Sequence, residues 1–245
     1  MKRGSLAALI VVALGSTAAQ AADEIDMTLV VGQDNFMKIS EDLAAATSYK
    51  ALTPAEPLGI TGFDIGVEMT STSVQSTDEM DAACGGCGLD TVVIPKIHLH
   101  KGLPMGFDVG LMYASSSNSN VTLTGYELRY ANIEGGMAMP ALATRLSYSK
   151  LEGVDDLSLE SKGIDVSLSK GFAMITPYVG VGQNWVTSKT DVIDTSTGLP
   201  FKDEEFTQTK YFVGFNLNMG LINFDLEADK TGEAQTIGAK IGFRF

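Results

Sequence analysis

Two histidines in this 245-residue chain have a spacing that could support chemistry. His98 and His100 lie two positions apart in "IHLHKG", so on a β-strand both side chains would point to the same face. Such a pair can bind a metal ion or transfer protons in acid–base catalysis. The sequence contains no G-x-S-x-G nucleophile motif, and no Ser/His/Asp set is evident. We therefore predict structural or interior-lining histidines and a protein that is not an enzyme.

A C-x-x-C motif, "ACGGCG", places Cys84 and Cys87 in a polar, Gly-rich stretch. A redox role for such a motif requires a helix amino terminus in a βαβ context, and the surrounding sequence predicts neither. Two thiols without further ligands are too few for a structural zinc site. The oxidising compartment of a secreted chain favours a disulfide between Cys84 and Cys87, with metal capture by reduced thiols as the alternative. We expect no cofactor and no bound metal.

The composition is acidic, with 30 Asp and Glu against 17 Lys and Arg and a formal net charge of −13. This balance argues against nucleic acid or anionic lipid headgroups as electrostatic partners. Several of the carboxylates lie in segment 188–206, "SKTDVIDTSTGLPFKDEEF". Oxygen-rich loops can bind calcium, but the D-x-D-x-D-G spacing is missing there, so we expect a solvated loop.

Residues 1–21 have the three-part layout of a secretory signal peptide. Lys2 and Arg3 precede an apolar run from Leu6 to Leu14, and small residues surround position 20. The run is too short to span a bilayer as a mature helix, although an uncleaved anchor is the alternative. We predict cleavage after Ala21, and removing Lys2 and Arg3 takes the formal net charge from −13 to −15.

Apolar and polar residues alternate along most of the chain beyond residue 58. In "GFDIGVEM", for example, Phe63, Ile65 and Val67 share one face, and Asp64 lies on the other. The pattern predicts strands with one apolar and one polar side. Most are about ten residues or longer, the length that a tilted strand needs to cross a membrane. The predicted strands cover residues 58–73, 90–101, 106–116, 121–133, 140–151, 158–170, 174–187, 205–219, 222–230 and 234–245.

The connections between these strands alternate in length. Short Gly-rich links such as "KGLPMG" and "KGFAM" are separated by polar and mostly longer ones. An up-and-down barrel in an outer membrane has this arrangement, with tight turns on the periplasmic side. A secreted β-sandwich would also alternate, but it does not explain the loop lengths. We predict an all-β fold, an antiparallel transmembrane barrel of about ten strands over residues 58–245, with both ends on the periplasmic side.

The last strand has a distinctive ending. In "IGAKIGFRF", Ile237, Ala239, Ile241, Phe243 and Phe245 alternate with glycines and basic residues. This ending resembles that of Gram-negative bacterial outer-membrane β-barrel proteins, which typically finish with an aromatic residue after alternating hydrophobic positions. The resemblance implies location in the cell outer membrane, contact with its lipid, and an assembly signal at Phe243 and Phe245 for the barrel assembly machinery. It identifies the class and no specific member.

The polar faces of the strands would line the lumen, where charges must be paired or hydrated. The sequence is compatible with a lumen closed by ion pairs and with a narrow pore or ligand cleft. A ten-stranded barrel is close to the size that side chains fill. Glycines on these faces would relieve crowding or leave space. The lumen-lining candidates are Asp64, Glu68, Lys96, His98, His100, Asp108, Arg129, Arg145, Asp165, Asp225, Glu227, Lys240 and Arg244.

Residues 22–57 do not alternate, and we predict that they form a periplasmic segment. Apolar residues spaced by three and four predict a short amphipathic helix at about 36–49, capped by Asp34 or Asn35 and followed by Pro54. The segment could plug the lumen from below, lie along the barrel rim or tether the first strand.

The sequence leaves three functional classes open. The first is a narrow pore, uptake channel or occluded barrel for small or hydrophobic solutes. The second is a structural or surface-interaction barrel that acts through its extracellular loops, and an outer-membrane hydrolase is a distant third.

Overall fold

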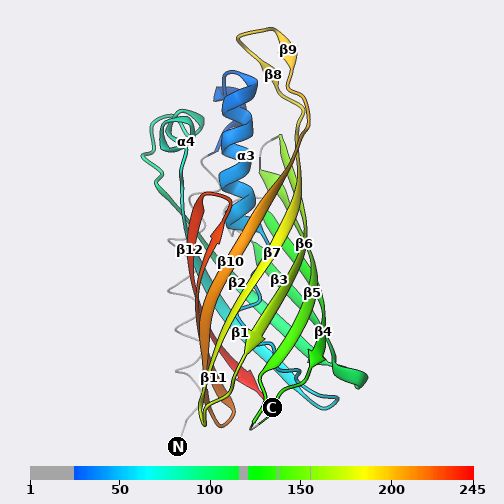
Figure 1. Ribbon diagram of the computed structural model, residues 1–245. Helices are drawn as coiled ribbons and strands as arrows, with labels where there is room; N and C mark the ends of the chain where they lie inside the picture. Colours follow the sequence, from blue (N-terminus) through cyan, green and yellow to red (C-terminus); the bar gives the residue numbers. More distant parts are fainter. Residues whose placement is uncertain (1–24, 116–120, 137, 155) are drawn as a thin grey trace, which may run out of the picture.

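The computed structural model describes residues 25–115, 121–136, 138–154 and 156–245, so the predicted signal peptide lies outside them. Ten antiparallel strands form one closed barrel, as the alternation predicted (Figure 1). The barrel strands are β1 (Phe63–Ser73), β2 (Thr91–Gly102), β3 (Phe107–Ser115), β4 (Thr122–Ile133), β5 (Ala141–Val154), β6 (Leu157–Ser169), β7 (Ile175–Thr190), β10 (Glu204–Met219), β11 (Ile222–Thr231) and β12 (Ala234–Arg244).

The predicted strand bounds agree with the structure to within a few residues, except at the first strand. That strand was expected from residue 58 but begins at Phe63, because residues 58–62 turn across the mouth of the barrel. The Leu58 N–H donates to Asp108 at 3.0 Å, and the Gly62 N–H donates to the Gly59 carbonyl at 2.9 Å. These backbone N–H groups therefore bond to a side chain and to a turn carbonyl, and not to the backbone of a neighbouring strand.

The last strand closes the barrel against the first. β12 pairs with β1 in a register that places Ile65 opposite Phe243. Phe63 and Phe245 exchange two backbone hydrogen bonds, with N···O distances of 2.7 and 3.0 Å. Their rings also stack, with centroids 5.8 Å apart. The carboxyl-terminal residue therefore leaves no open sheet edge at this seam.

The two ends of the barrel differ. The lower end in Figure 1 holds the start of β1, the carboxyl terminus and the short turns, including the 3-10 turn η2 (Pro104–Gly106). The upper end holds helix α4 (Thr77–Ala83) and a hairpin made of β8 (Ile193–Asp194) and β9 (Leu199–Pro200), and β11 and β12 are joined there by a short turn. Neither α4 nor the hairpin was predicted from the sequence, because both are too short to show a period.

The outer surface of the barrel is an apolar belt. Along each strand, exposed apolar side chains alternate with buried polar ones, as in β11, where Leu226 is 43% exposed and Glu227 is buried. The belt gives way to polar residues toward the upper end, for example at Lys162 on β6 and Lys230 on β11. Among the described residues, no helix is long and apolar enough to cross a membrane.

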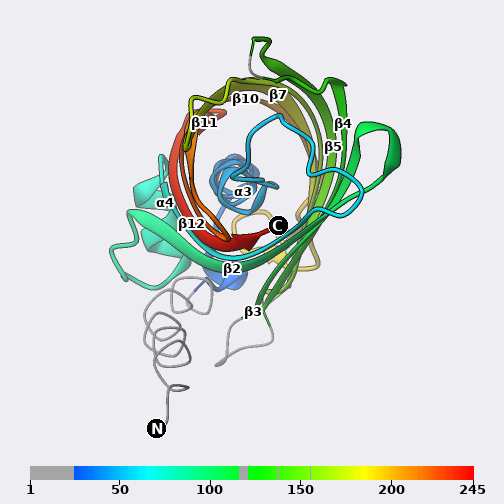
Figure 2. The ribbon, with the colours of Figure 1, turned by 90° about the horizontal axis from the view of Figure 1, so that it is seen from below.

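The predicted amphipathic helix exists as α3 (Gln33–Thr47), and it lies inside the barrel (Figure 2). It follows the 3-10 turn η1 (Met27–Leu29) at the upper end. Its cap is Gly32, whose φ of 89° suits glycine, and not Asp34 or Asn35.

The placement of this segment at the end with the short turns was wrong. The apolar side chains that pack against the helix are found in the upper half of the lumen, whereas the lower half is lined by charged side chains.

Candidate functional site

The lumen is filled by a single pass of the chain from the upper to the lower end. Gly32 and Gln33 contact the β8–β9 loop at the top, where the Gly32 N–H donates to Asp194 at 3.2 Å. Hydrogen bonds from the Ser196 side chain lower the pKa of Asp194 below its ordinary value, so this acceptor is charged at neutral pH. At the bottom, the backbone of Leu58 is bound by Asp108. Of the three positions left open by the sequence, the structure shows a plug, inserted from the upper end. We call residues 33–58 the lumen segment.

The upper half of the lumen is an apolar core built around α3. Phe36, Ile39 and Leu43 are buried on the helix, and the Phe36 ring lies 5.3 Å from that of Phe201. Inward-facing residues near the upper ends of the strands complete the core, namely Val74, Val92, Leu123, Leu151, Leu159 and Val186. Burial of this apolar surface holds the helix in the barrel.

The lower half of the lumen holds an extended stretch of the segment through polar contacts. The Lys50 ammonium donates to Asp229 at 3.0 Å, and both side chains are almost fully buried. Lys210 donates to the Tyr49 carbonyl at 3.0 Å, and Arg129 donates to the Pro54 carbonyl at 2.6 Å. Each of these strand cations satisfies a backbone group that water would otherwise have to bind.

The strand side chains around this stretch form chains of ion pairs and contacts between carboxylates and histidine rings. Glu68 lies 2.8 Å from Lys96 and 2.5 Å from the His98 ring. Glu127 lies 3.4 Å from His100 and 3.0 Å from Arg145. The contacts of Glu68 join the neighbouring strands β1 and β2, and the Glu127–Arg145 contact joins β4 and β5, so these pairs also fix the strand register. The His100–Glu127 contact spans β3, which lies between β2 and β4.

A second group of ion pairs lies near the lower mouth. Asp64 lies 2.7 Å from Arg244 and 3.4 Å from Lys240, and Lys240 also lies 3.3 Å from Asp225. Arg244 reaches into the lumen segment and donates to the Thr53 hydroxyl at 2.8 Å.

The structure places every predicted lumen-lining residue on an inner strand face. All thirteen are buried except Arg244, which is partly exposed at the mouth. The groups that the lumen segment itself contributes, chiefly Tyr49 and Lys50, were not predicted from the sequence. The signal for Lys50 was its place between a tyrosine and the apolar "AL", where its neighbours would be buried. A lysine buried with them requires a carboxylate partner.

His98 and His100 have no room for a substrate in this arrangement. Their rings stack at 5.1 Å, and the Tyr49 hydroxyl lies 3.4 Å from His100 Nε2. In the described part of the chain, neither histidine belongs to a group of three metal ligands that lie close together. The geometry supports the structural role that was expected for them.

The inward glycines make room for bulky side chains. A Cβ atom on Gly110 would lie 2.6 Å from the Tyr49 hydroxyl, and one on Gly238 would lie 3.0 Å from Leu52 Cδ2. A Cβ on Gly180 would overlap the ring of Phe212. The glycines relieve crowding, and two of them form recesses for the lumen segment.

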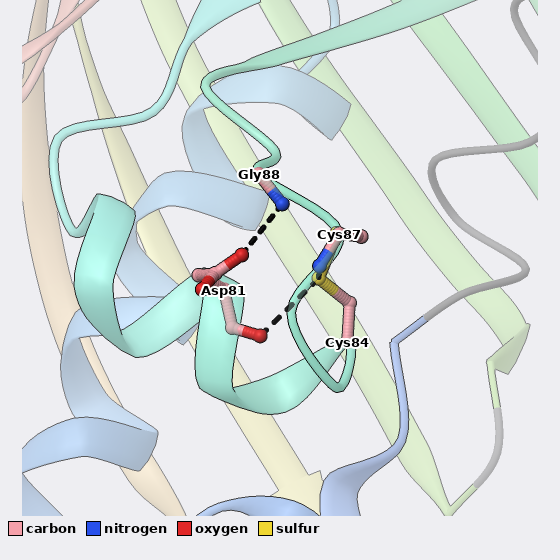
Figure 3. The surroundings of a disulfide bond; sticks show 4 residues. All are labelled: Asp81, Cys84, Cys87 and Gly88. Atoms are coloured by element: carbon pink, nitrogen blue, oxygen red, sulfur yellow. Dashed lines mark hydrogen bonds between the residues drawn. A yellow bond between two sulfur atoms is a disulfide. The ribbon is translucent and has the colours of Figure 1, made fainter.

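The predicted Cys84–Cys87 disulfide is present, in the loop that follows α4 (Figure 3). The Gly88 N–H donates to the Asp81 carboxylate at 2.5 Å and ties the loop to the helix. The sulfurs follow the carboxyl end of the helix, whose partial negative charge disfavours a thiolate. Asp81, Cys84 and Cys87 form the single group of three close metal ligands among the described residues, but the bonded sulfurs are not thiolates. The arrangement therefore suits a structural cross-link.

A polar cavity of about 410 Å³ opens beside α3, above the β11–β12 turn. Two of its cations have carboxylate partners, since Lys38 lies 2.6 Å from Glu79 and Lys230 lies 2.9 Å from Glu233. Asp42 accepts hydrogen bonds from the backbone of residues 75 and 76. Glu41 also lines the cavity, whose lining carries charges of both signs.

No family model matches the chain, and no curated protein matches it. Among solved structures, it is similar to the amino-terminal β-barrel domain of OprF from Pseudomonas aeruginosa, with 12% identity over 74% of this chain and 97% of that one and a TM-score of 0.38. It is similar to OprG from the same organism, with 10% identity over 79% of this chain and 99% of that one and a TM-score of 0.38. It is also similar to Neisserial surface protein A, with 9% identity over 75% of this chain and 94% of that one and a TM-score of 0.32. These likenesses concern the barrel fold alone, and the chain matches no specific member.

Proposed function

We propose that this protein is an occluded outer-membrane barrel that acts through its upper surface rather than as an open channel. The single observation that carries the proposal is the passage of the lumen segment through the whole barrel, with an apolar core above and ion pairs below. A solute would have to displace both. The proposal includes no catalytic activity, because the histidines are buried beneath Tyr49.

The outer surface supports insertion in a membrane. The apolar belt surrounds a closed ring of strands, in which each strand pairs with a neighbour on both sides. Aromatic rings gather near its lower edge, where Phe107 lies 4.7 Å from Tyr130 and Phe63 stacks on Phe245. Girdles of this kind mark the interface of outer-membrane barrels. Short turns face the periplasm in such barrels, so the upper end faces the exterior.

Conductance in a planar bilayer tests the occlusion. We expect refolded mature protein to insert without a steady current, and a variant that lacks residues 22–57 to conduct. A steady current from the intact protein, with folding verified by heat-modifiable mobility on a detergent gel, would contradict the proposal. The gel separates a closed barrel from one that failed to fold.

A gated pore is the second candidate, and the polar lining of the lower half favours it. If the lumen segment withdrew, charged side chains such as Glu68, Arg145 and Asp165 would line a hydrophilic passage. Rare openings of the intact protein that disappear when α3 is cross-linked to the wall would support this candidate. Their absence under all voltages would leave the occluded barrel.

A further inference from the structure

The amino-terminal end of the described chain lies at the upper end of the barrel, opposite the carboxyl terminus. The Asp26 N–H donates to the Ala83 carbonyl at the end of α4, at 2.9 Å. The Gln33 side chain donates to the Lys202 carbonyl at 2.9 Å, beyond the β8–β9 hairpin. Both partners belong to the upper loops, whereas Phe245 is paired with Phe63 at the lower end.

The topology accounts for this separation. Ten antiparallel strands return the chain to the end at which the first strand began. The lumen segment adds one further pass, so the described chain begins and ends at opposite ends of the barrel. The chain cannot double back through the lumen, because the lumen segment and the inward side chains already fill it.

The predicted cleavage site lies only a few residues before the buried start of the described chain. Ile25 and Met27 are buried in the upper core. With cleavage after Ala21, residues 22–24 precede them and reach about 10 Å when fully extended. The hydrocarbon layer is about 30 Å thick, so these residues cannot return to the lower side.

We infer that the barrel presents its mature amino terminus on the cell exterior and serves as an anchor for it. Residues 25–32 form part of an upper surface together with α4 and the β8–β9 hairpin, and a polypeptide joined ahead of Ile25 would be held outside. The inference rests on the proposed insertion in the outer membrane, with the upper end outward.

Epitope tags at three positions test it in the full-length chain. One tag follows Ala22, a second lies between Ser196 and Thr197 in the β8–β9 hairpin, and a third follows Gly171 in the β6–β7 turn. Antibody binding is compared on intact and permeabilised cells, and heat-modifiable mobility verifies that each tagged barrel folds. We expect the first two tags to give the same signal before and after permeabilisation, and the third to give a signal only afterwards.

The outcomes separate the inference from the proposal beneath it. An amino-terminal tag hidden on intact cells that expose the hairpin tag would overturn the inference and leave the orientation intact. A hidden hairpin tag with an exposed β6–β7 tag would overturn the orientation, and with it both statements. Asp23→Cys, labelled with a membrane-impermeant maleimide, gives the same readout without an inserted tag, since Cys84 and Cys87 are bonded to each other.

Discussion

A disulfide between α3 and the barrel wall should form without rearrangement. The hydroxyl oxygens of Ser40 on α3 and Ser188 on β7 lie 2.8 Å apart, and both side chains are fully buried. Disulfides require Cβ atoms about 3.5–4.5 Å apart, and the hydroxyl contact brings the two Cβ atoms close to this range. We expect Ser40→Cys/Ser188→Cys to oxidise spontaneously in the folded barrel.

The expected stabilisation follows from the length of chain that the bond closes. The two positions are 148 residues apart in sequence. Loop closure of that size removes unfolded-state entropy worth up to about 5 kcal/mol. For a chain of this length, such a gain raises the unfolding temperature by about 10–20 °C. Strain in the native state would reduce the gain.

The assay is thermal unfolding in detergent with and without reductant, together with mobility on a non-reducing gel. Because reductant also opens the native disulfide, the wild type under both conditions is the reference. Lys38→Cys/Ser188→Cys is the matched control, since Lys38 points to Glu79 on α4 and away from β7. If the Ser40/Ser188 pair stays reduced in a folded barrel, or if the control pair cross-links equally well, α3 does not occupy the lumen as described.

Three further substitutions test the packing and the assembly. Gly110→Ala would place a Cβ 2.6 Å from the Tyr49 hydroxyl, so we expect a loss of about 1–3 kcal/mol in urea unfolding, and unchanged stability would refute the close packing. Lys50→Met leaves Asp229 buried without its cation and should cost about 3–5 kcal/mol, most of which a second change, Asp229→Asn, should recover. Phe245→Lys removes the ring contact with Phe63 and places a charge at the exposed apolar position, so it should reduce the heat-modifiable form in membranes, and normal insertion would contradict an assembly role for this residue.

The strands could be predicted from the sequence because their environment repeats every two residues. Lipid-like surroundings on one side and a polar interior on the other leave the same alternation in every strand, so even the bounds of β12 follow from it. The inward direction of His98 and His100 follows for the same reason. Their carboxylate partners, Glu68 and Glu127, could not be predicted in this way, because identifying them requires the register between strands.

The location of the lumen segment could not be predicted, because its contacts are distant in sequence. Lys50 and Asp229 are 179 residues apart, and Gln33 and Glu204 are 171 apart. The helical period identified α3 and its apolar face, but any apolar surface could have covered that face. Only the closed barrel shows that apolar residues line the upper half of the interior.

The barrel and its lumen segment depend on one another. Lys50 neutralises Asp229, and residues 53 and 54 accept hydrogen bonds from Arg244 and Arg129. Removing the segment would therefore leave buried strand charges that only incoming water could satisfy, and it would uncover the upper apolar core. The segment is then part of the folded interior rather than a ligand of a preformed tube. A deletion variant that folds must admit water to its lumen and should conduct, so it is the current of the intact protein that distinguishes a closed barrel from a gated one.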